Sequence, residues 1–301
     1  MKENTHSPSP PPPPQKSTIL FSEPVDQLPS RLPSVQEIES SSHVLKELWS
    51  KRVVRVGEHY VVKYGGDTEP IEGENMRFAR QHLKSVVPRL YAIYQRPRPK
   101  RSSPITYIVM EYVHGRPLSE IWSTMDDTER VRIINSLRDS LRILRSITPP
   151  DYFGSIGRTK LNDEIFSATG EHENHTMTGP FKTESDLIHA LVLRYRKEVG
   201  DRLHQKADFF QHVLPKTLQG DGKAVFTHGD LQRKNIIVGS DGSITIIDWQ
   251  PSGWYPVWWE YVITMETDDW KDDWHQYGPR YLSEFPSHYA WYHMLCHELW
   301  Y

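Results

Sequence analysis

The amino-acid sequence predicts an α+β protein, and three patterns of apolar residues lead to this fold class. In residues 53–65 apolar and polar side chains alternate, which is typical of two half-buried strands joined by a turn. In residues 126–147 apolar side chains recur at heptad-like spacing, which is typical of a core helix with one wet side. Two β-branched runs, residues 236–238 and 244–247, flank an Asp-Gly pair and predict a β-hairpin.

The first third of the chain is predicted to contain two helices and four strands. A short helix is expected over residues 34–49, and a second helix over residues 69–84. The second helix has a stripe of residues that step by four, three and four along one face: Glu72, Met76, Ala79 and Leu83. Beyond the hairpin, strands are expected over residues 87–94 and 105–113, the latter as a central strand of the sheet.

The rest of the chain is predicted to be mostly helical. Helices are expected over residues 126–147 and 183–199, with a further helical segment to residue 218, whereas residues 151–180 have the turn residues of a long surface loop. At the other end, residues 1–33 contain a proline run and are expected to form a flexible, partly polyproline II tail. This Pro-rich tail is either an unstructured leader or a ligand for an SH3 or WW domain.

Composition and charge exclude several classes of protein. The chain has 301 residues and a net charge of −3, so no overall field favours nucleic acid or an anionic membrane surface. The one cysteine, Cys296, rules out an internal disulfide framework and fits a reducing compartment. No apolar run approaches the roughly 20 residues of a membrane span, and the N-terminus lacks a secretory signal. We therefore expect a soluble, cytoplasmic protein with no nucleic-acid and no membrane partner.

Three polar side chains in residues 225–250 are of the types that metal-assisted phosphoryl transfer requires. Asp230 can accept a proton, Asn235 follows five residues later, and Asp248 ends a hydrophobic strand. The predicted hairpin folds Asp248 back beside Asn235, so that two oxygen ligands converge on one point. Hard oxygen ligands suit Mg²⁺, which proteins bind through one or two carboxylates together with substrate phosphates. The alternative is that Asp230 and Asn235 only cap a turn, as such residues often do.

The same segment resembles a known family. Asp-x4-Asn followed by a strand-terminal Asp is the arrangement of the catalytic loop and the metal-binding Asp in kinases. The loop reads His228-Gly229-Asp230 instead of His-Arg-Asp, and the strand ends in Asp248-Trp249-Gln250 instead of Asp-Phe-Gly. In this form the chain is similar to the aminoglycoside phosphotransferase (APH) and choline kinase branch of the kinase-like fold. It most closely resembles the fungal APH-domain proteins.

The resemblance implies a two-lobed protein kinase-like fold, with ATP in the cleft between the lobes. A small N-lobe with an antiparallel sheet would span residues 34–113 and bind the nucleotide. A larger, mostly helical C-lobe would span residues 114–301 and carry the catalytic loop, the metal site and the acceptor region. In this arrangement Asp230 would be the catalytic base, and Asn235 and Asp248 would hold Mg²⁺.

The resemblance also assigns nucleotide-binding residues. Lys63, at the end of the first predicted hairpin, would pair with the α- and β-phosphates of ATP, although no glycine-rich loop precedes it. Glu72 would form an ion pair with Lys63, since a carboxylate on an apolar stripe needs a partner. Glu74 is the alternative partner, but it lies off the stripe. Backbone groups of the hinge between the lobes would contact adenine, and the hinge residues are Met110, Glu111, Tyr112 and Val113.

The function implied is transfer of a phosphoryl group from ATP to a hydroxyl group of a small molecule. No Ala-Pro-Glu segment and no activation loop follow Asp248, which argues against a protein kinase. The alternative is a nucleotide-binding pseudokinase or scaffold with little or no activity. The presence of the full set of chemical groups argues against it: Lys63, Asp230, Asn235 and Asp248.

The C-terminal part of the chain is rich in aromatic and acidic residues, and each group allows two interpretations. Eight of the ten tryptophans lie at or beyond Trp249, and they either pack the lobe or form a substrate cage. An acidic cluster either forms a solvated face or binds a cationic acceptor, and its members are Glu266, Asp268, Asp269, Asp272 and Asp273.

Overall fold

The structure, a computed structural model, describes residues 17–98, 103–166, 175–267, 270 and 273–300. The contacts between residues divide the chain into two compact units. Unit 1 comprises Met1–Thr68 and Tyr91–Met110, and unit 2 comprises Glu69–Leu90 and Glu111–Tyr301. Unit 1 therefore holds the sheet that the sequence predicts for the N-lobe, whereas the helix predicted over residues 69–84 belongs to unit 2.

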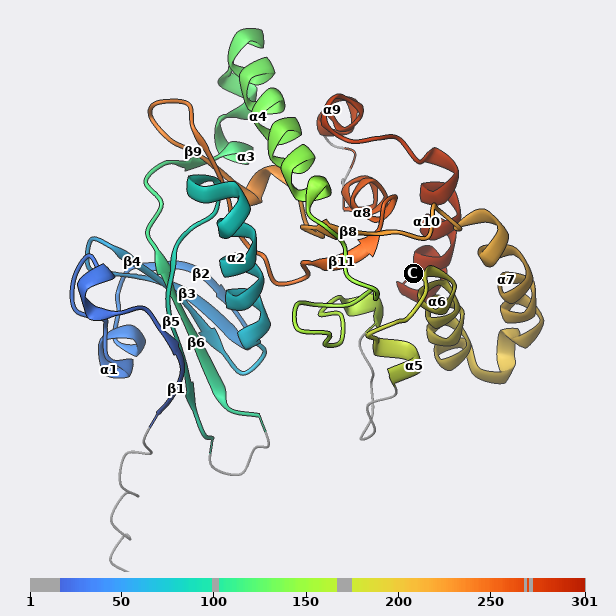
Figure 1. The fold of residues 1–301 in the computed structure, drawn as a ribbon, viewed down its shortest axis with the longest axis horizontal. Helices are drawn as coiled ribbons and strands as arrows, with labels where there is room; N and C mark the ends of the chain where they lie inside the picture. The colour runs from blue at the N-terminus through green and yellow to red at the C-terminus, as the bar shows by residue number, and fades with distance from the viewer. Residues whose placement is uncertain (1–16, 99–102, 167–174, 268–269, 271–272, 301) are drawn as a thin grey trace, which may run out of the picture. The chain divides into compact units, whose positions relative to one another are not determined.

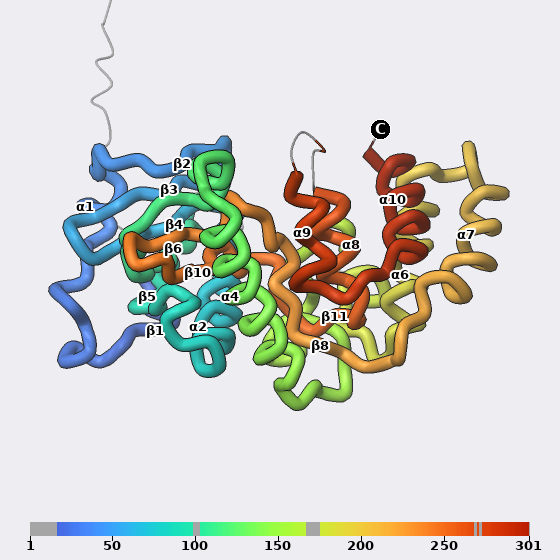
Figure 2. Tube along the Cα trace, turned by 90° about the horizontal axis from the view of Figure 1, so that it is seen from above, coloured from blue at the N-terminus to red at the C-terminus, as the bar shows by residue number. Residues whose placement is uncertain are grey.

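Unit 1 is built on a six-stranded sheet in the order β1-β5-β6-β4-β3-β2 (Figure 1 and Figure 2, blue to green). The pairs β1–β5, β2–β3 and β3–β4 are antiparallel. The strands are β1 Thr18–Ser22, β2 Val44–Leu48, β3 Lys51–Val56, β4 Tyr60–Gly65, β5 Leu90–Arg96 and β6 Ile105–Glu111, with a short 3₁₀ turn, η1, at Val25–Gln27.

The β3–β4 hairpin confirms the first hairpin predicted from the sequence. Val54 pairs with Val62, and Gly57 takes a φ of +64° in the turn, a conformation that glycine adopts without steric cost. Val54 and Val62 lie in the apolar cluster on one face of the sheet. Because side chains alternate along a strand, Lys63 lies on the opposite face, where its side chain is only 9% exposed.

The expectation of a disordered tail over residues 1–33 is wrong for the part that the structure describes. Thr18–Ser22 forms β1, which adds to the sheet by pairing with β5, and Tyr60 donates a hydrogen bond to the carbonyl of Ser30. The segment Thr-Ile-Leu-Phe-Ser gains its backbone partners from a strand about 70 residues away, and local composition does not reveal such a partner. The proline run at residues 10–14 lies outside the described residues.

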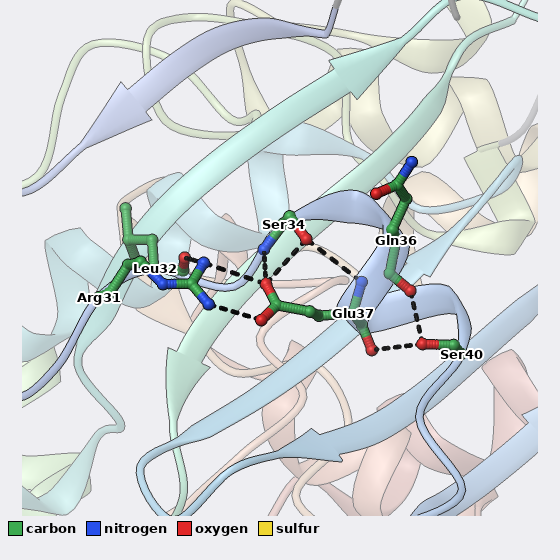
Figure 3. A network of polar contacts seen from close by, with 6 residues as sticks. All are labelled: Arg31, Leu32, Ser34, Gln36, Glu37 and Ser40. Carbon is green, nitrogen blue, oxygen red and sulfur yellow. Dashed lines mark hydrogen bonds and ion pairs between the residues drawn. The ribbon is translucent and has the colours of Figure 1, made fainter.

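The helix expected over residues 34–49 is also wrong in extent, because it ends after five residues. Helix α1 is Val35–Glu39, and the chain then forms the edge strand β2 (Figure 1). A capping box starts the helix: Ser34 accepts from the Glu37 N–H, and the Glu37 carboxylate accepts from the Ser34 N–H (Figure 3). Arg31 pairs with Glu37 at 2.5 Å in the same polar network. A run of serines follows the helix. The next apolar residues belong to β2, which pairs with β3.

Unit 2 is mostly helical. Its helices are α2 Pro70–Leu83, α3 Leu118–Ile121, α4 Asp127–Ser146, α5 His175–Thr178, α6 Glu184–Val199, α7 His204–Thr217, α8 Trp259–Glu266, α9 Trp274–Tyr281 and α10 Pro286–Trp300. Its strands are β7 Arg116–Pro117, β8 Ala224–Thr227, β9 Ile236–Val238, β10 Ile244–Ile246 and β11 Gly253–Pro256. Short 3₁₀ turns are η2 Lys84–Val86, η3 Trp122–Thr124, η4 Glu164–Phe166, η5 Gly200–Leu203 and η6 Arg233–Asn235.

The long helices of unit 2 confirm the helices predicted from the periodicity of the sequence. Helix α4 starts with a capping box between Asp126 and Glu129 and buries its apolar stripe, and α6 starts at the predicted position. Helices α6 and α7 pack against each other and against α10, as both views show (Figure 1 and Figure 2). Helix α8 in turn packs against α9 and α10. Within the described residues, no helix has both the length and the apolar character that crossing a membrane requires.

Candidate active site

The β9–β10 hairpin brings the metal-ligand candidates Asn235 and Asp248 to neighbouring positions, as the sequence predicts. Ile236 pairs with Ile246, and the N–H of Ile247 donates to the carbonyl of Asn235 at 2.9 Å. Asp248 follows directly after this bond. The two ends of the hairpin are therefore fixed to each other by backbone hydrogen bonds, one residue before the Asp248 side chain.

Residues 228–235, which we call the catalytic loop after their predicted role, hold Asp230 by contacts from within the loop. The Nδ2 group of Asn235 donates to the carboxylate Oδ2 and to the carbonyl of Asp230, both at 2.8 Å. Gln232 donates to Oδ1 of the same carboxylate, and Lys234 Nζ lies 3.6 Å from Oδ2. These donors hold the carboxylate in one orientation. With Nδ2 of Asn235 occupied, its amide oxygen remains as an acceptor or a ligand.

Asp248 has an unusual backbone conformation, with a φ of +66°. Only a few per cent of residues other than glycine have a positive φ, although Asp and Asn tolerate it best, and such positions occur often at functional sites. This conformation turns the chain sharply out of the β9–β10 hairpin. Asp248 lines the same pocket as Asp230.

His228 links the two halves of the site by its backbone and by both ring nitrogens. Its Nδ1 accepts from the N–H of Asp230 at 3.2 Å, and its Nε2 lies 3.1 Å from the carbonyl of Ile247. Since Nδ1 is an acceptor, Nε2 carries the proton and donates to that carbonyl. The ring also meets Trp249 edge to face at 4.7 Å. His228 is thus a brace between the catalytic loop and the segment that carries Asp248.

Glu260, on helix α8, accepts hydrogen bonds from the catalytic loop, and the sequence alone does not predict this role. Its carboxylate accepts from the backbone N–H of His228 at 2.7 Å and of Gly229 at 3.1 Å, and the residue is 1% exposed. Charged acceptors of backbone N–H groups form stronger hydrogen bonds than neutral ones. Nearby, Arg145 donates to the carbonyl of Val257; burial lowers the pKa of its guanidinium, while the charge of Glu260 opposes that shift. The sequence shows only the pattern Trp-Glu-Tyr at this position.

Asn75 is a second residue whose role the sequence does not reveal. It lies on α2, is completely buried, and donates through Nδ2 to the carbonyls of Trp249 and Ser252 at 3.1 and 2.9 Å. Ser252 in turn donates through Oγ to the carbonyl of His228 at 2.8 Å. These bonds join α2, the catalytic loop and the turn after Asp248 in one buried network.

A pocket of about 370 Å³ is lined by Asp230 and Asp248 together with residues of other segments. Its lining comes from the catalytic loop, the turn after Asp248, and the segments around η4, α8 and α10: Asn162, Asp163, Glu164, Gly229, Asp230, Asp248, Gln250, Pro251, Ile263, Glu266, Thr267, Tyr292 and Trp300. Burial raises the pKa of the Asp163 carboxyl to about 6, and the nearby charge of Asp230 adds to this shift. The pocket thus combines several carboxyl groups with two aromatic side chains.

The nucleotide-binding candidates divide between the two units. Lys63 and Met110 belong to unit 1, whereas Glu72, Glu111, Tyr112 and Val113 belong to unit 2. Glu72 is buried on the predicted stripe of α2, whereas Glu74 is exposed.

Glu111 at the predicted hinge is engaged in contacts within unit 2. Its N–H donates to the carbonyl of Arg89 at 2.9 Å, and its carboxylate accepts from the Arg89 N–H at 2.9 Å. Arg80 lies 3.5 Å from the same carboxylate. The N–H of Glu111 is therefore used within the protein, and Tyr112 and Val113 follow it in the chain.

Most of the C-terminal tryptophans serve packing. Trp249, Trp258 and Trp259 are fully buried, and Trp259 stacks between Phe166 and Tyr255 with centroid distances of 5.4 and 5.0 Å. Trp300, by contrast, lines the pocket. In the acidic cluster, Glu266 lines the pocket and contacts His293 at 2.9 Å. Asp273 accepts from the indole of Trp122 at 2.7 Å. Asp268, Asp269 and Asp272 lie outside the described residues.

The residues at the end of the hairpin fit a magnesium ion by the chemistry of their donors. A carboxylate from Asp248 and an amide oxygen from Asn235 are hard oxygen ligands, which Mg²⁺ prefers to nitrogen or sulfur. The amide nitrogen of Asn235 is held by Asp230, so its oxygen is the atom available to a cation. Asp248 lines the pocket, which leaves room for further oxygen ligands.

Comparisons with known proteins agree with this geometry. The family model for APH, described as the phosphotransferase enzyme family, matches residues 43–295. Comparison with curated proteins finds no match. Among solved structures, the GDP and kanamycin complex of APH(2")-IIia has a TM-score of 0.54 at 14% identity, covering 87% of this chain and 86% of that one. An apo thermostable mutant of APH(4)-Ia has a TM-score of 0.51 at 15% identity, covering 88% and 82%. These similarities confirm the kinase-like α+β fold.

Proposed function

Because the chain belongs to the APH phosphotransferase enzyme family, we propose that it is a small-molecule kinase. It moves the γ-phosphoryl group of Mg-ATP to a hydroxyl group of its acceptor. The observation that carries the proposal is the Asp230 carboxylate, which lines a pocket and is held by Asn235 and Gln232. A carboxylate fixed in this way can orient a hydroxyl group and accept its proton.

Asp230 acts as the base in this proposal. It accepts the hydrogen bond of the acceptor hydroxyl and takes its proton as the oxygen attacks phosphorus. The contacts of Asn235 and Gln232 fix the direction in which the carboxylate faces, so that little reorganisation is needed when the acceptor binds. His228 keeps its proton on Nε2 and braces the loop.

For the nucleotide and the metal we propose the residues that the sequence indicates. Asn235 and Asp248 would hold Mg²⁺, which when bound supplies positive charge to the phosphate oxygens. We propose Lys63 and Glu72 as nucleotide-binding residues, and the ammonium group of Lys63 would neutralise further phosphate charge. For adenine we propose the hinge of Met110, Glu111, Tyr112 and Val113. Since the Glu111 N–H donates to Arg89, the contacts would come from the other backbone groups of this hinge.

The pocket lining favours an acceptor with amino groups. Five acidic residues line one small volume: Asp163, Glu164, Asp230, Asp248 and Glu266. Two of them are assigned to the base and the metal, which leaves three for the acceptor. Ammonium groups would compensate their charge, and the apolar faces of Tyr292 and Trp300 would cover the remaining surface of the acceptor.

The experiment is a screen of the purified full chain for Mg-dependent consumption of ATP or GTP. The acceptors are amino alcohols, sugars and aminoglycosides, and transfer to one of them is the expected result. Asp230→Asn should lower turnover by roughly 10²–10⁴ while nucleotide titration stays unchanged. Asp139→Asn on the exposed side of α4 is the matched control. Unchanged turnover in Asp230→Asn would refute the base.

Two further variants test the nucleotide site. Lys63→Ala and Asp248→Ala should each weaken nucleotide binding in titration calorimetry with Mg-ATP. Unaltered binding in both would argue against the site itself. If the wild type binds nucleotide but no acceptor stimulates its consumption, the protein is better described as a pseudokinase.

A further inference from the structure

An arginine in the catalytic loop is held between two tryptophans. Arg233 lies in η6, between Asp230 and Asn235 in the sequence, and its side chain is only 12% exposed. Its guanidinium carbon lies 5.6 Å from the ring centroid of Trp122 and 5.6 Å from that of Trp274. The two indoles are 5.4 Å apart and nearly perpendicular, at 89°. A cation this close to two aromatic faces is attracted by both rings.

A carboxylate and a second arginine complete this arrangement. Asp273 lies 3.6 Å from Arg233 Nη1 and accepts a hydrogen bond from the Trp122 indole at 2.7 Å. Arg130 of α4 also lies over the Trp122 ring, with its guanidinium carbon 5.1 Å from the centroid, and it donates to the carbonyl of Trp122. Its Nη1 is 3.9 Å from Asp273. We call this set of five residues the arginine clamp: Arg130, Trp122, Arg233, Asp273 and Trp274.

The arginine clamp joins segments that are far apart in the sequence. Trp122 begins η3, Arg130 lies on α4, and Trp274 begins α9. The catalytic loop contributes Arg233 alone, whereas its neighbours Gln232 and Lys234 both contact the Asp230 carboxylate. Adjacent side chains of the loop thus have separate tasks: Gln232 and Lys234 act on Asp230, and Arg233 anchors the loop to the surrounding helices.

The backbone of the loop connects this anchor to the reacting groups. The N–H of Gln232 donates to the carbonyl of Asp230 at 2.9 Å, and the N–H of Asn235 donates to the carbonyl of Gln232 at 2.9 Å. These two bonds set the spacing between Asp230 and Asn235. Since Arg233 lies inside this turn, a shift of its side chain would move the turn and both functional residues with it.

We propose that Arg233 is a positioning residue of the phosphotransferase reaction, which it serves by locking the turn between Asp230 and Asn235. The expected effect on catalysis rests on the proposed function. The restraint that Arg233 places on the loop does not depend on that function. A planar guanidinium can stack on indoles and approach a carboxylate at the same time, which a lysine ammonium does less well. Arg233→Lys therefore retains the positive charge but only part of the contacts with the two indoles and Asp273. Arg233→Met retains only a side chain of similar length.

The first test measures hydrogen exchange in peptides of residues 228–238, because exchange reports local opening without any substrate. We expect roughly tenfold faster exchange in Arg233→Met, with peptides of α6 and α7 unchanged, and an intermediate rate in Arg233→Lys. Arg142→Met is the matched control, since Arg142 is an exposed arginine paired with Asp139 on α4. Unchanged exchange of the loop, or equal acceleration in all peptides, would overturn the proposal. If Arg233→Met does not fold, Arg233→Lys decides by the same criteria.

The second test measures turnover with the acceptor found in the screen. We expect kcat to fall about tenfold or more in Arg233→Met while KM for the nucleotide changes less than about threefold, because the variant disturbs the base and not the bound nucleotide. If kcat falls by the same factor as KM for the nucleotide rises, or if neither changes, Arg233 has no positioning role in catalysis. If the wild type transfers no phosphoryl group, the proposed function fails, whereas the exchange experiment still decides whether Arg233 locks the loop.

Discussion

The two units of the protein place their polar side chains in contrasting environments. In unit 1 the network of Arg31, Ser34 and Glu37 lies at the surface, with side chains that are 74% exposed for Arg31 and 44% for Glu37 (Figure 3). In unit 2 the network around the catalytic loop is buried, and Glu260 and His228 are each 1% exposed. The two networks therefore differ in their exposure to water.

This difference determines what each network contributes. When an exposed ion pair breaks, water replaces each lost partner at little cost in free energy. Such pairs therefore add little to stability. A buried polar group has no water to replace a lost partner, so removing one member leaves the other unsatisfied. We therefore expect substitutions near the catalytic loop to be severe and those in the surface network to be mild.

Glu260→Gln should have the largest effect. In the wild type the backbone N–H groups of His228 and Gly229 each donate to one oxygen of the Glu260 carboxylate. A glutamine has one oxygen and one NH₂ group there, so one of these two backbone donors would lose its acceptor. We expect a loss of roughly 2–4 kcal/mol in the free energy of unfolding, measured by urea denaturation. Glu120→Gln is the control, since Glu120 forms an exposed pair with Arg116. If both substitutions changed the free energy of unfolding equally, burial would not determine the size of the effect.

Asp163→Asn should have an intermediate effect that depends on pH. Burial raises the pKa of Asp163 to about 6 in the folded protein, above its ordinary value of about 4. Between about pH 4 and 6 the folded state binds more protons, so the free energy of unfolding falls as pH rises through this window and is level above it. Relative to Asp163→Asn, the wild type should lose up to about 2 kcal/mol between pH 4 and 7.

The measurement for Asp163 is urea unfolding of both proteins at half-unit steps of pH. Asp151→Asn is the control, because Asp151 pairs with Arg158 at the surface of the same loop. A constant difference between wild type and Asp163→Asn across the range would contradict the raised pKa.

Glu37→Gln should have the smallest effect. The hydrogen bond from Arg31 lowers the pKa of Glu37 to about 2, so its contribution is present above about pH 4.5 and is lost as pH falls through 2. Solvent screens this pair, and glutamine can replace glutamate in the capping box. Thermal unfolding at pH 7 should give the same Tm for both proteins within error. A clear fall in Tm would mean that the surface network matters more than its exposure suggests.

The sequence predicts well those features that local pattern determines. The periodicity of α4, the alternation of β3 and β4, and the spacing of Asp230 and Asn235 all depend on neighbouring residues, and the structure contains each of these elements. Local pattern does not indicate strands β1 and β2, because their backbone partners lie elsewhere in the chain and pairing overrides local preference.

The supporting residues of the site show the same limit. Glu260 and Asn75 act on backbone groups of distant segments, and backbone donors and acceptors leave no trace in residue identity. Arg233 has its partners about 110 residues earlier and 40 residues later in the chain. A motif can therefore indicate which groups react, but the residues that hold them become visible only in three dimensions.

The contact between Glu260 and the catalytic loop also has a consequence for synthesis of the chain. Ribosomes make residues 228–235 before Glu260, and domains generally form as their segments become available. The N–H groups of His228 and Gly229 cannot meet their acceptor until α8 has been synthesised. The nascent loop must remain without its final shape for some 30 residues of elongation. Assembly of this site is thus a late event in the production of each molecule.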